Sequence, residues 1–199
     1  LEKDPIPGGA CDGYKYQDIG YVMRGGREMD NHFECMWDLF RSIPSIEDEN
    51  VTVLDEYYWL NKHDPNYSLC RATVNCGEDA HTDGKFGLSD KGAMEILKLF
   101  MTPDEQLYDK KITDFFDDEV LNTNFWLYWR TMFAFENWHS ALEMKRYLQR
   151  YIHHIGGLPD FTALRFTRYN QYESMILPMV KYLESYGVQF HYGVKVTNV

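Results

Sequence analysis

Apolar side chains recur at helical spacing through much of the chain, and this pattern predicts a mostly helical middle. The first run begins directly after Glu28 and comprises Met29, Phe33, Met36, Trp37 and Phe40. Comparable patterning predicts further helices over residues 51–61, 89–101, 140–155 and 170–186. Pro178 predicts a kink or break in the last of these helices, because proline cannot donate the helical backbone hydrogen bond.

Two local signals predict where helices start and stop. The string Thr102-Pro103-Asp104-Glu105 has the form of a capping box with proline at the first helical position, so a helix start is expected there. Gly156 and Gly157 follow the helical pattern of 140–155 and predict its end.

Strand-like residues stand near both ends of the chain. The stretches 188–192 and 194–199 are predicted to be short strands, and 69–75 is compatible with another. A helix followed by two such strands is typical of a chain returning to a Rossmann-type sheet. The first residue is leucine and the chain stops within a strand-like pattern, so we expect an internal piece of a longer protein.

Aromatic side chains are dense between residues 124 and 139. Aromatic residues make up 16% of the chain and hydrophobic residues 44%, which is ample for a core. Core packing is the first expectation for this stretch. The wall of an apolar ligand tunnel would use the same residues, and both interpretations stay open: Phe125, Trp126, Tyr128, Trp129, Phe133, Phe135 and Trp138.

The net charge of −11 argues against nucleic acid as a partner, since the phosphate backbone requires a basic surface. The same charge opposes electrostatic adsorption of the whole chain to anionic lipid. No signal peptide or membrane span is evident. Cys11, Cys35, Cys70 and Cys76 form no C-x2-C pair, so free thiols in a reducing cytoplasm are expected.

His81 lies between Asp79 and Asp83, a trio that could bind a metal ion or could simply be a solvated loop. We favour the solvated loop and predict no metal site.

The string Arg24-Gly25-Gly26-Arg27-Glu28 carries the clearest candidate chemistry. Two arginines can fix phosphate or carboxylate groups, and two glycines allow the backbone to approach a ligand closely. The helical pattern that follows places Glu28 at the junction of a loop and a helix N-terminus. An anion-binding loop that holds a carboxylate is one interpretation, and a turn with solvated arginines and a capping Glu28 is the other.

A second candidate lies at the start of the chain. An acidic residue, Glu2, stands after a strand-like residue and before the pair Gly8-Gly9 and Ala10. This arrangement resembles the second strand of flavin-binding Rossmann domains, where the carboxylate hydrogen-bonds a ribose. An ordinary surface glutamate before a Pro-Gly turn is the alternative.

Three longer stretches resemble one family specifically. They are residues 24–34, residues 54–61 (Leu-Asp-Glu-Tyr-Tyr-Trp-Leu-Asn) and residues 145–155 (Lys-Arg-Tyr-Leu-Gln-Arg-Tyr-Ile-His-His-Ile). Together they resemble the oleate hydratases, flavin-containing fatty-acid hydratases also called myosin-cross-reactive antigens. The resemblance extends over essentially the whole chain.

The resemblance implies a hydro-lyase that adds water to a cis double bond of an unsaturated fatty acid, as in conversion of oleate to 10-hydroxystearate. It implies that Glu28 activates water and that Tyr147 protonates the alkene. FAD, favoured in its reduced form, would organise the site and its charge without net redox change. The implied FAD-binding residues are Glu2, Gly8, Gly9, Ala10, Arg24, Gly25, Gly26, Arg27, Glu28 and Val196.

The implied fold class is α/β, an amine-oxidase-like FAD-binding Rossmann domain interrupted by a mostly helical substrate domain and incomplete at both ends. Residues 1–30 and 187–199 would belong to the FAD-binding domain and residues 31–186 to the substrate and catalytic region. The family resemblance further implies a cytoplasmic homodimer with peripheral contact to membranes.

Two other functions remain open from the sequence. A flavin oxidoreductase of the amine-oxidase or desaturase type would share Glu2 and the glycine pair. A fatty-acid-binding fragment without activity would share the aromatic residues. Because the upstream G-x-G-x-x-G fingerprint is absent, we expect the 199-residue piece to be inactive by itself.

Overall fold

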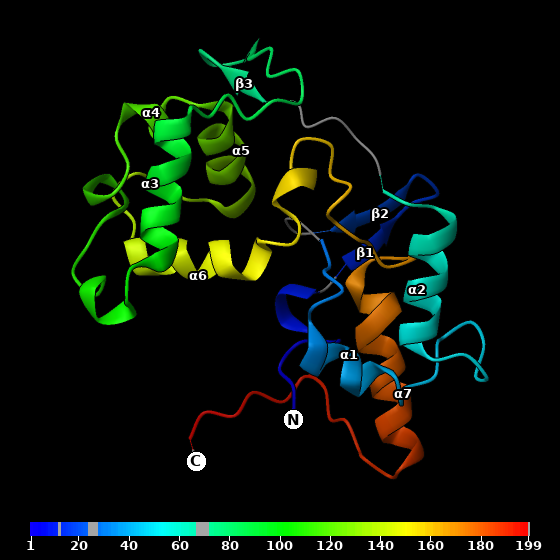
Figure 1. The fold of residues 1–199 in the computed structure, drawn as a ribbon. Helices are drawn as coiled ribbons and strands as arrows, with labels where there is room; N and C mark the ends of the chain where they lie inside the picture. The colour runs from blue at the N-terminus through cyan, green and yellow to red at the C-terminus, as the bar shows by residue number, and fades with distance from the viewer. Residues whose placement is uncertain (12, 24–27, 67–71, 199) are drawn as a thin grey trace. The chain divides into compact units, whose positions relative to one another are not determined.

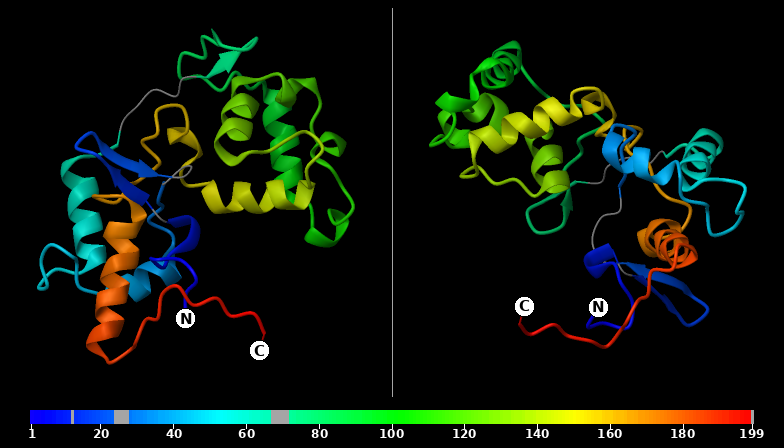
Figure 2. Two further views of the ribbon diagram at one scale, coloured as in Figure 1. Left: turned by 180° about the vertical axis from the view of Figure 1, so that it is seen from behind. Right: turned by 90° about the horizontal axis from the view of Figure 1, so that it is seen from below.

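The computed structural model describes residues 1–11, 13–23, 28–66 and 72–198. The chain divides into two compact units. The first unit is formed by Leu1–Asn66 with Leu164–Val199, and the second by Tyr67–Ala163. Figures 1 and 2 show the course of the chain in both.

Three helices build the core of the first unit: α1 (Glu34–Phe40), α2 (Val53–His63) and α7 (Leu177–Ser185). They lie side by side (Figure 1). The apolar faces of these helices bury one cluster of side chains, which is the main stabilising contact of this unit. Its buried members are Met29, Trp37, Phe40, Ile43, Val53, Tyr57 and Met175.

The start of α2 is marked by a local cap, and that of α7 by a change of helix type. The Thr52 hydroxyl accepts a hydrogen bond from the Asp55 amide, and the Asp55 carboxylate accepts one from the Thr52 amide, which makes a capping box for α2. A π-helical turn, η5 (Tyr172–Ile176), precedes α7. Since Pro178 cannot donate a backbone hydrogen bond, the change from π to α geometry just before it fits the predicted break.

A β-hairpin that the sequence did not predict lies in the first unit. Strand β1 (Gly13–Tyr16) pairs antiparallel with β2 (Gly20–Met23), with Gly13 opposite Met23. The strands are only four residues long, and the residues between them lack the Asn-Gly type of turn that marks a hairpin. A single 3-10 turn, η1 (Gly9–Cys11), precedes the hairpin.

The strands predicted over 188–192 and 194–199 are wrong for the described residues, which adopt no strand there. Glu2 hydrogen-bonds this segment: its amide donates to the carbonyl of His191 (2.9 Å), and its carbonyl accepts from the amide of Val194 (2.8 Å). Gly193, with a φ of +70°, interrupts the extended backbone between the two contacts. A pairing of one residue is too short to make a ladder.

The second unit is helical around an aromatic core. It contains α3 (Asp90–Met101), α4 (Asp118–Leu121), α5 (Asn124–Phe133) and α6 (Ala141–Tyr151). Strands β3 (Thr73–Val74) and β4 (Glu78–Asp79) form a small antiparallel ladder, and 3-10 turns lie at η2 (Asp104–Gln106), η3 (Ile112–Asp114) and η4 (Ile155–Gly157). Core packing, the first expectation for the aromatic stretch 124–139, is confirmed for most of its rings but not for Trp138, which is 67% exposed; the buried rings are Phe125, Trp126, Tyr128, Trp129 and Phe135.

Two predicted helix signals act differently in the structure. The Thr102 hydroxyl donates to the carbonyl of Lys98 and so ends α3, which leaves only the single turn η2 where a new helix was expected. Helix α6 ends at Tyr151, before Gly156 and Gly157. A side chain at Gly157 would place its Cβ only 2.5 Å from the Ala163 amide nitrogen. Gly157 therefore permits close packing of two backbone segments and does not stop the helix.

The thiols of Cys11, Cys35 and Cys76 are free, and Cys70 lies outside the described residues. Among the described helices, none combines the length and apolar character needed to cross a membrane.

Candidate active site

Glu28 lies in an extended segment of the first unit and is exposed to solvent. The preceding residues of the motif, Arg24, Gly25, Gly26 and Arg27, lie outside the described residues. The prediction that Glu28 stands at a helix N-terminus is wrong, because α1 begins only at Glu34. The apolar spacing that suggested a longer helix arises because Met29 joins the same buried cluster as Trp37 and Phe40 without being helical.

The residues directly after Glu28 are held firmly. Met29 and Arg165 exchange two backbone hydrogen bonds of 2.7 and 3.0 Å in an antiparallel bridge. The carbonyl of Asp30 accepts a hydrogen bond from the Trp37 indole (2.8 Å). Met29 and Asp30 are only 4% and 2% exposed, so an exposed carboxylate is followed at once by buried backbone.

The chain before the arginine–glycine motif also has a fixed neighbour. Gly13 pairs with Met23, the last described residue before the motif. Gly13 also lies against the side chain of Asn170. A Cβ at position 13 would come within 2.6 Å of the Asn170 side-chain nitrogen, so a larger residue there would have to displace Asn170. Residues 165–170 therefore contact Met29, which directly follows the motif, and Gly13, the strand partner of Met23 before it.

Tyr147 lies on α6 in the second unit and is half-buried. Its ring packs edge-on against Phe135, with centroids 5.1 Å apart, and against Phe133 at 5.5 Å. Within the described residues no hydrogen bond fixes its hydroxyl. The ring is thus held by packing while the hydroxyl keeps its donor and acceptor capacity.

A buried cation anchors the helix that carries Tyr147. The Lys145 ammonium donates to the Thr102 carbonyl at 2.7 Å and to the Asp104 carboxylate at 2.6 Å. Arg146 also reaches Asp104, at 3.5 Å. The hydrogen bond from Lys145 is the main cause that holds the pKa of Asp104 below its ordinary value.

The other predicted cofactor residues lie in the first unit. Gly8 and Gly9 both have positive φ values, +114° and +54°, and Gly9 has open space where a side chain would be. Ala10 is exposed within η1, and Val196 is 52% exposed. The Glu2 carboxylate accepts a hydrogen bond from the Asp4 amide, while the Glu2 backbone lies beside His191 and Val194. The structure thus brings Glu2 close to the segment that carries Val196.

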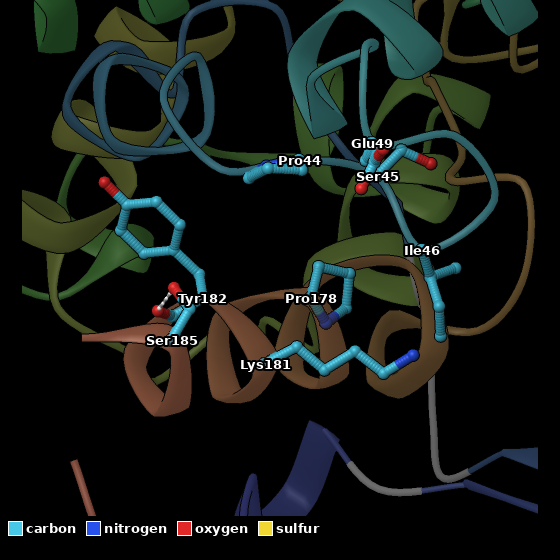
Figure 3. A pocket seen from close by; sticks show the side chains of 8 residues that line it. All are labelled: Pro44, Ser45, Ile46, Glu49, Pro178, Lys181, Tyr182 and Ser185. Atoms are coloured by element: carbon cyan, nitrogen blue, oxygen red, sulfur yellow. Dashed lines mark hydrogen bonds between the residues drawn. The ribbon is translucent and has the colours of Figure 1, made fainter. Parts of the chain in front are cut away.

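Two surface hollows of the first unit contain none of the predicted catalytic residues. One, of about 330 Å³, lies between the 44–49 loop and α7 and is shown in Figure 3; it is lined by Pro44, Ser45, Ile46, Glu49, Pro178, Lys181, Tyr182 and Ser185. The other, of about 440 Å³, lies beside Trp59 and Arg168. In the second unit, the side chains of His81 and Asp79 are both exposed, and the His81 Nδ1 lies 3.9 Å from the Asp79 Oδ1.

Sequence reasoning gave no role to Tyr57 and Asn31, which the structure brings together. The Tyr57 hydroxyl donates to the Asn31 side-chain oxygen at 2.8 Å. Tyr57 lies in the recognised stretch 54–61, and Asn31 lies in the recognised stretch 24–34. Both residues lie in stretches that resemble the oleate hydratases, which could have marked them as candidates. Their spacing in the sequence, however, does not show that the two stretches are in contact.

Comparison with known proteins places the chain in a family. A model of the MCRA family matches residues 1–199. The oleate hydratase of Streptococcus pyogenes serotype M49 (strain NZ131) is 52% identical over 199 residues, which cover 100% of this chain and 34% of that protein. The linoleate hydratase of Lactiplantibacillus plantarum is 34% identical over 177 residues, or 86% of this chain and 31% of that protein. The chain therefore spans about a third of the length of these curated relatives, and it belongs to the MCRA family.

Proposed function

We propose that the protein to which this chain belongs hydrates a cis double bond of an unsaturated fatty acid. The observation that carries the proposal is the identity of 52% to an oleate hydratase along all 199 residues. The second relative, named a linoleate hydratase, supports the same class of reaction on a related substrate.

The proposed chemistry uses Tyr147 as acid and Glu28 as base. The Tyr147 hydroxyl gives its proton to one alkene carbon, where the π electron pair forms the new C–H bond. The oxygen of a water molecule bonds to the other carbon, and the Glu28 carboxylate takes the proton that this water loses. Proton exchange with solvent then returns both side chains to their starting states, so the reaction adds one H2O without oxidation.

The surroundings of the two residues suit these roles. A phenol is a weak acid and an isolated alkene a weak base, so we expect proton transfer and water attack to be closely coupled. The negative charge of Glu28 would also stabilise the developing carbocation. Buried backbone directly after Glu28 limits its movement, and the rings packed around Tyr147 limit its rotation.

FAD is the cofactor that this proposal includes, and the residues of the first unit fit it. Gly8 and Gly9 adopt conformations that favour glycine, and Gly9 leaves open space for a ligand to approach the backbone. The Glu2 carboxylate would accept hydrogen bonds from the ribose hydroxyls. When bound, FAD in its reduced form would supply charge and shape near the substrate. Arg24, Gly25, Gly26, Arg27 and Val196 are proposed as further contacts.

The proposed domain plan follows from the same fit. Residues 1–30 and 187–199 would form part of a Rossmann-type FAD-binding domain, and residues 31–186 the substrate and catalytic region. The two backbone hydrogen bonds between Glu2 and the 191–194 segment support this plan, because they hold the two parts of the proposed FAD-binding domain together. The homodimer and the peripheral membrane contact stay predictions from the family resemblance.

The test is mass spectrometry of oleate incubated with the full-length protein and reduced FAD, beside the Glu28→Gln and Tyr147→Phe variants. The proposal expects a product about 18 mass units heavier, the mass of one water, and its near-complete loss in both variants. Absence of this product would overturn it. A substrate-dependent change in the flavin absorbance would point to an oxidoreductase, and oleate binding without product to a binding protein.

A further inference from the structure

We propose that the side chains of Tyr57 and Asn31 form a latch that fixes the backbone after Glu28, which makes them positioning residues for the catalytic carboxylate. This inference rests on the proposed function, because it assigns a purpose to the precise placement of Glu28. Neither residue has to touch the substrate for the latch to act.

The latch joins consecutive residues of one segment to two different helices. The Trp37 indole of α1 donates to the Asp30 carbonyl, and the Tyr57 hydroxyl of α2 donates to the Asn31 side chain, both at 2.8 Å. The two rings stack on each other, with centroids 4.1 Å apart and planes inclined by 29°. A stacked pair thus presents two donors side by side to two neighbouring residues.

Burial makes these hydrogen bonds consequential. Tyr57 is 2% exposed, so a hydroxyl without a partner would lose its hydration on folding and gain nothing in return. Burial, assisted by the charge of Asp30 and opposed by that of Arg165, raises the pKa of Tyr57 well above its ordinary value. The phenol therefore keeps its proton and remains a donor across the range of pH in which enzymes work.

The contrast along the segment indicates what the latch does. Glu28 is exposed, while Met29 and Asp30 are buried and Met29 is paired with Arg165. The backbone is therefore fixed within one residue of the carboxylate, although the carboxylate itself is open to solvent. Fixing a base in this way favours attack by its bound water, since misplacement by about 1 Å can lower a rate 100-fold.

The experiment compares Tyr57→Phe with Tyr58→Phe in the full-length hydratase. Both variants remove one hydroxyl from α2, and the phenyl ring introduced by Tyr57→Phe would keep the stacking on Trp37. Tyr58 is half exposed and its hydroxyl is not part of the latch, so it is a matched control. We expect Tyr57→Phe to lower kcat by roughly 10- to 100-fold with KM for oleate nearly unchanged, and Tyr58→Phe to lower neither.

Asn31→Ala provides an independent variant, because Asn31 is exposed and its truncation leaves the core intact. Its kcat should fall as in Tyr57→Phe, and the double variant should be no slower than the slower single variant, since both remove one hydrogen bond. A purely structural role would instead lower the melting temperature and leave kcat per folded molecule unchanged in every variant.

Glu28→Gln, measured in parallel, separates the two proposals. If Glu28→Gln lowers kcat but Tyr57→Phe and Asn31→Ala change kcat no more than Tyr58→Phe does, the latch is overturned and the role of Glu28 stands. A rate that survives Glu28→Gln would overturn the catalytic role of Glu28 and the latch with it. The expected split between kcat and KM in both latch variants would support the latch.

Discussion

Glu28 and Tyr147 are placed by different kinds of contact. Backbone hydrogen bonds and burial hold the residues next to Glu28, whereas aromatic packing holds the Tyr147 ring itself. The Tyr147 hydroxyl has no hydrogen-bond partner among the described residues, so it contributes little to the stability of the fold. Removing that hydroxyl should therefore change activity far more than stability.

We predict that Tyr147→Phe lowers the hydratase rate by about 100-fold or more, the usual loss when a general acid is removed. The free energy of unfolding should change by less than about 1 kcal/mol, because the ring contacts with Phe133 and Phe135 persist. Product formation by mass spectrometry and thermal unfolding check the two parts. Tyr151→Phe, one helical turn away and also packed on Phe133, is the control and should stay active. Equal rates in the two variants would contradict the role of Tyr147.

At the scale of elements, η4 contains two adjacent glycines that differ sharply in their surroundings. A Cβ on Gly157 would meet the Ala163 amide nitrogen at 2.5 Å, while a Cβ on Gly156 would meet nothing within 4 Å. We predict that Gly157→Ala destabilises the protein by about 1–3 kcal/mol through overpacking. Gly156→Ala should change stability by less than about 1 kcal/mol, and chemical denaturation of both measures the difference. Similar losses in both would show that the contact at Gly157 is easily relieved.

A second prediction at this scale concerns the ion pair that ties α6 to the loop after α3. The pKa of Asp104 lies below its ordinary value of 3.8, chiefly because Lys145 donates a hydrogen bond to it. As pH falls, the Asp104 carboxylate is therefore protonated at a higher pH in the unfolded chain than in the folded one. The stabilisation by the ion pair is complete above the unfolded pKa, and it is lost as pH falls through the lowered pKa of the folded state. Lys145→Met should melt several degrees below wild type near neutral pH, with a gap that narrows below about pH 4. A gap that is constant with pH would rule out the charge contribution.

Helix starts marked by a local cap were predictable from sequence, and features that depend on distant partners were not. Ser89 accepts a hydrogen bond from Gly92 and starts α3 as expected. The string at 102–105 has equally good capping residues, yet the Thr102 hydroxyl donates to the Lys98 carbonyl at the end of α3, and the Asp104 carboxylate accepts from Lys145. The stretch 188–198 has strand-like composition, but no strand forms there among the described residues. A strand is completed by its neighbours, which its own sequence does not specify.

The same limit applies to the candidate site. Glu28 and Tyr147 were chosen by resemblance, and their types suit base and acid. The latch contact between Tyr57 and Asn31 joins two strings far apart in sequence, so no spacing rule could reveal it. The exposed position of Glu28, well before α1, also could not be read from apolar periodicity, because Met29 enters the core without being helical.

At the scale of the whole molecule, the proposed acid and base come from different units: Glu28 from the first and Tyr147 from the second. If both act in one step, removing either should abolish that step, and removing the second should cost little more. We therefore predict that the Glu28→Gln/Tyr147→Phe double variant is about as slow as the slower single variant, measured as initial rates of hydroxy fatty acid formation. Losses that multiply would mean that the two residues act in separate steps, and the coupled mechanism would then have to be abandoned. Strong non-additivity would show instead that the two residues act in the same step.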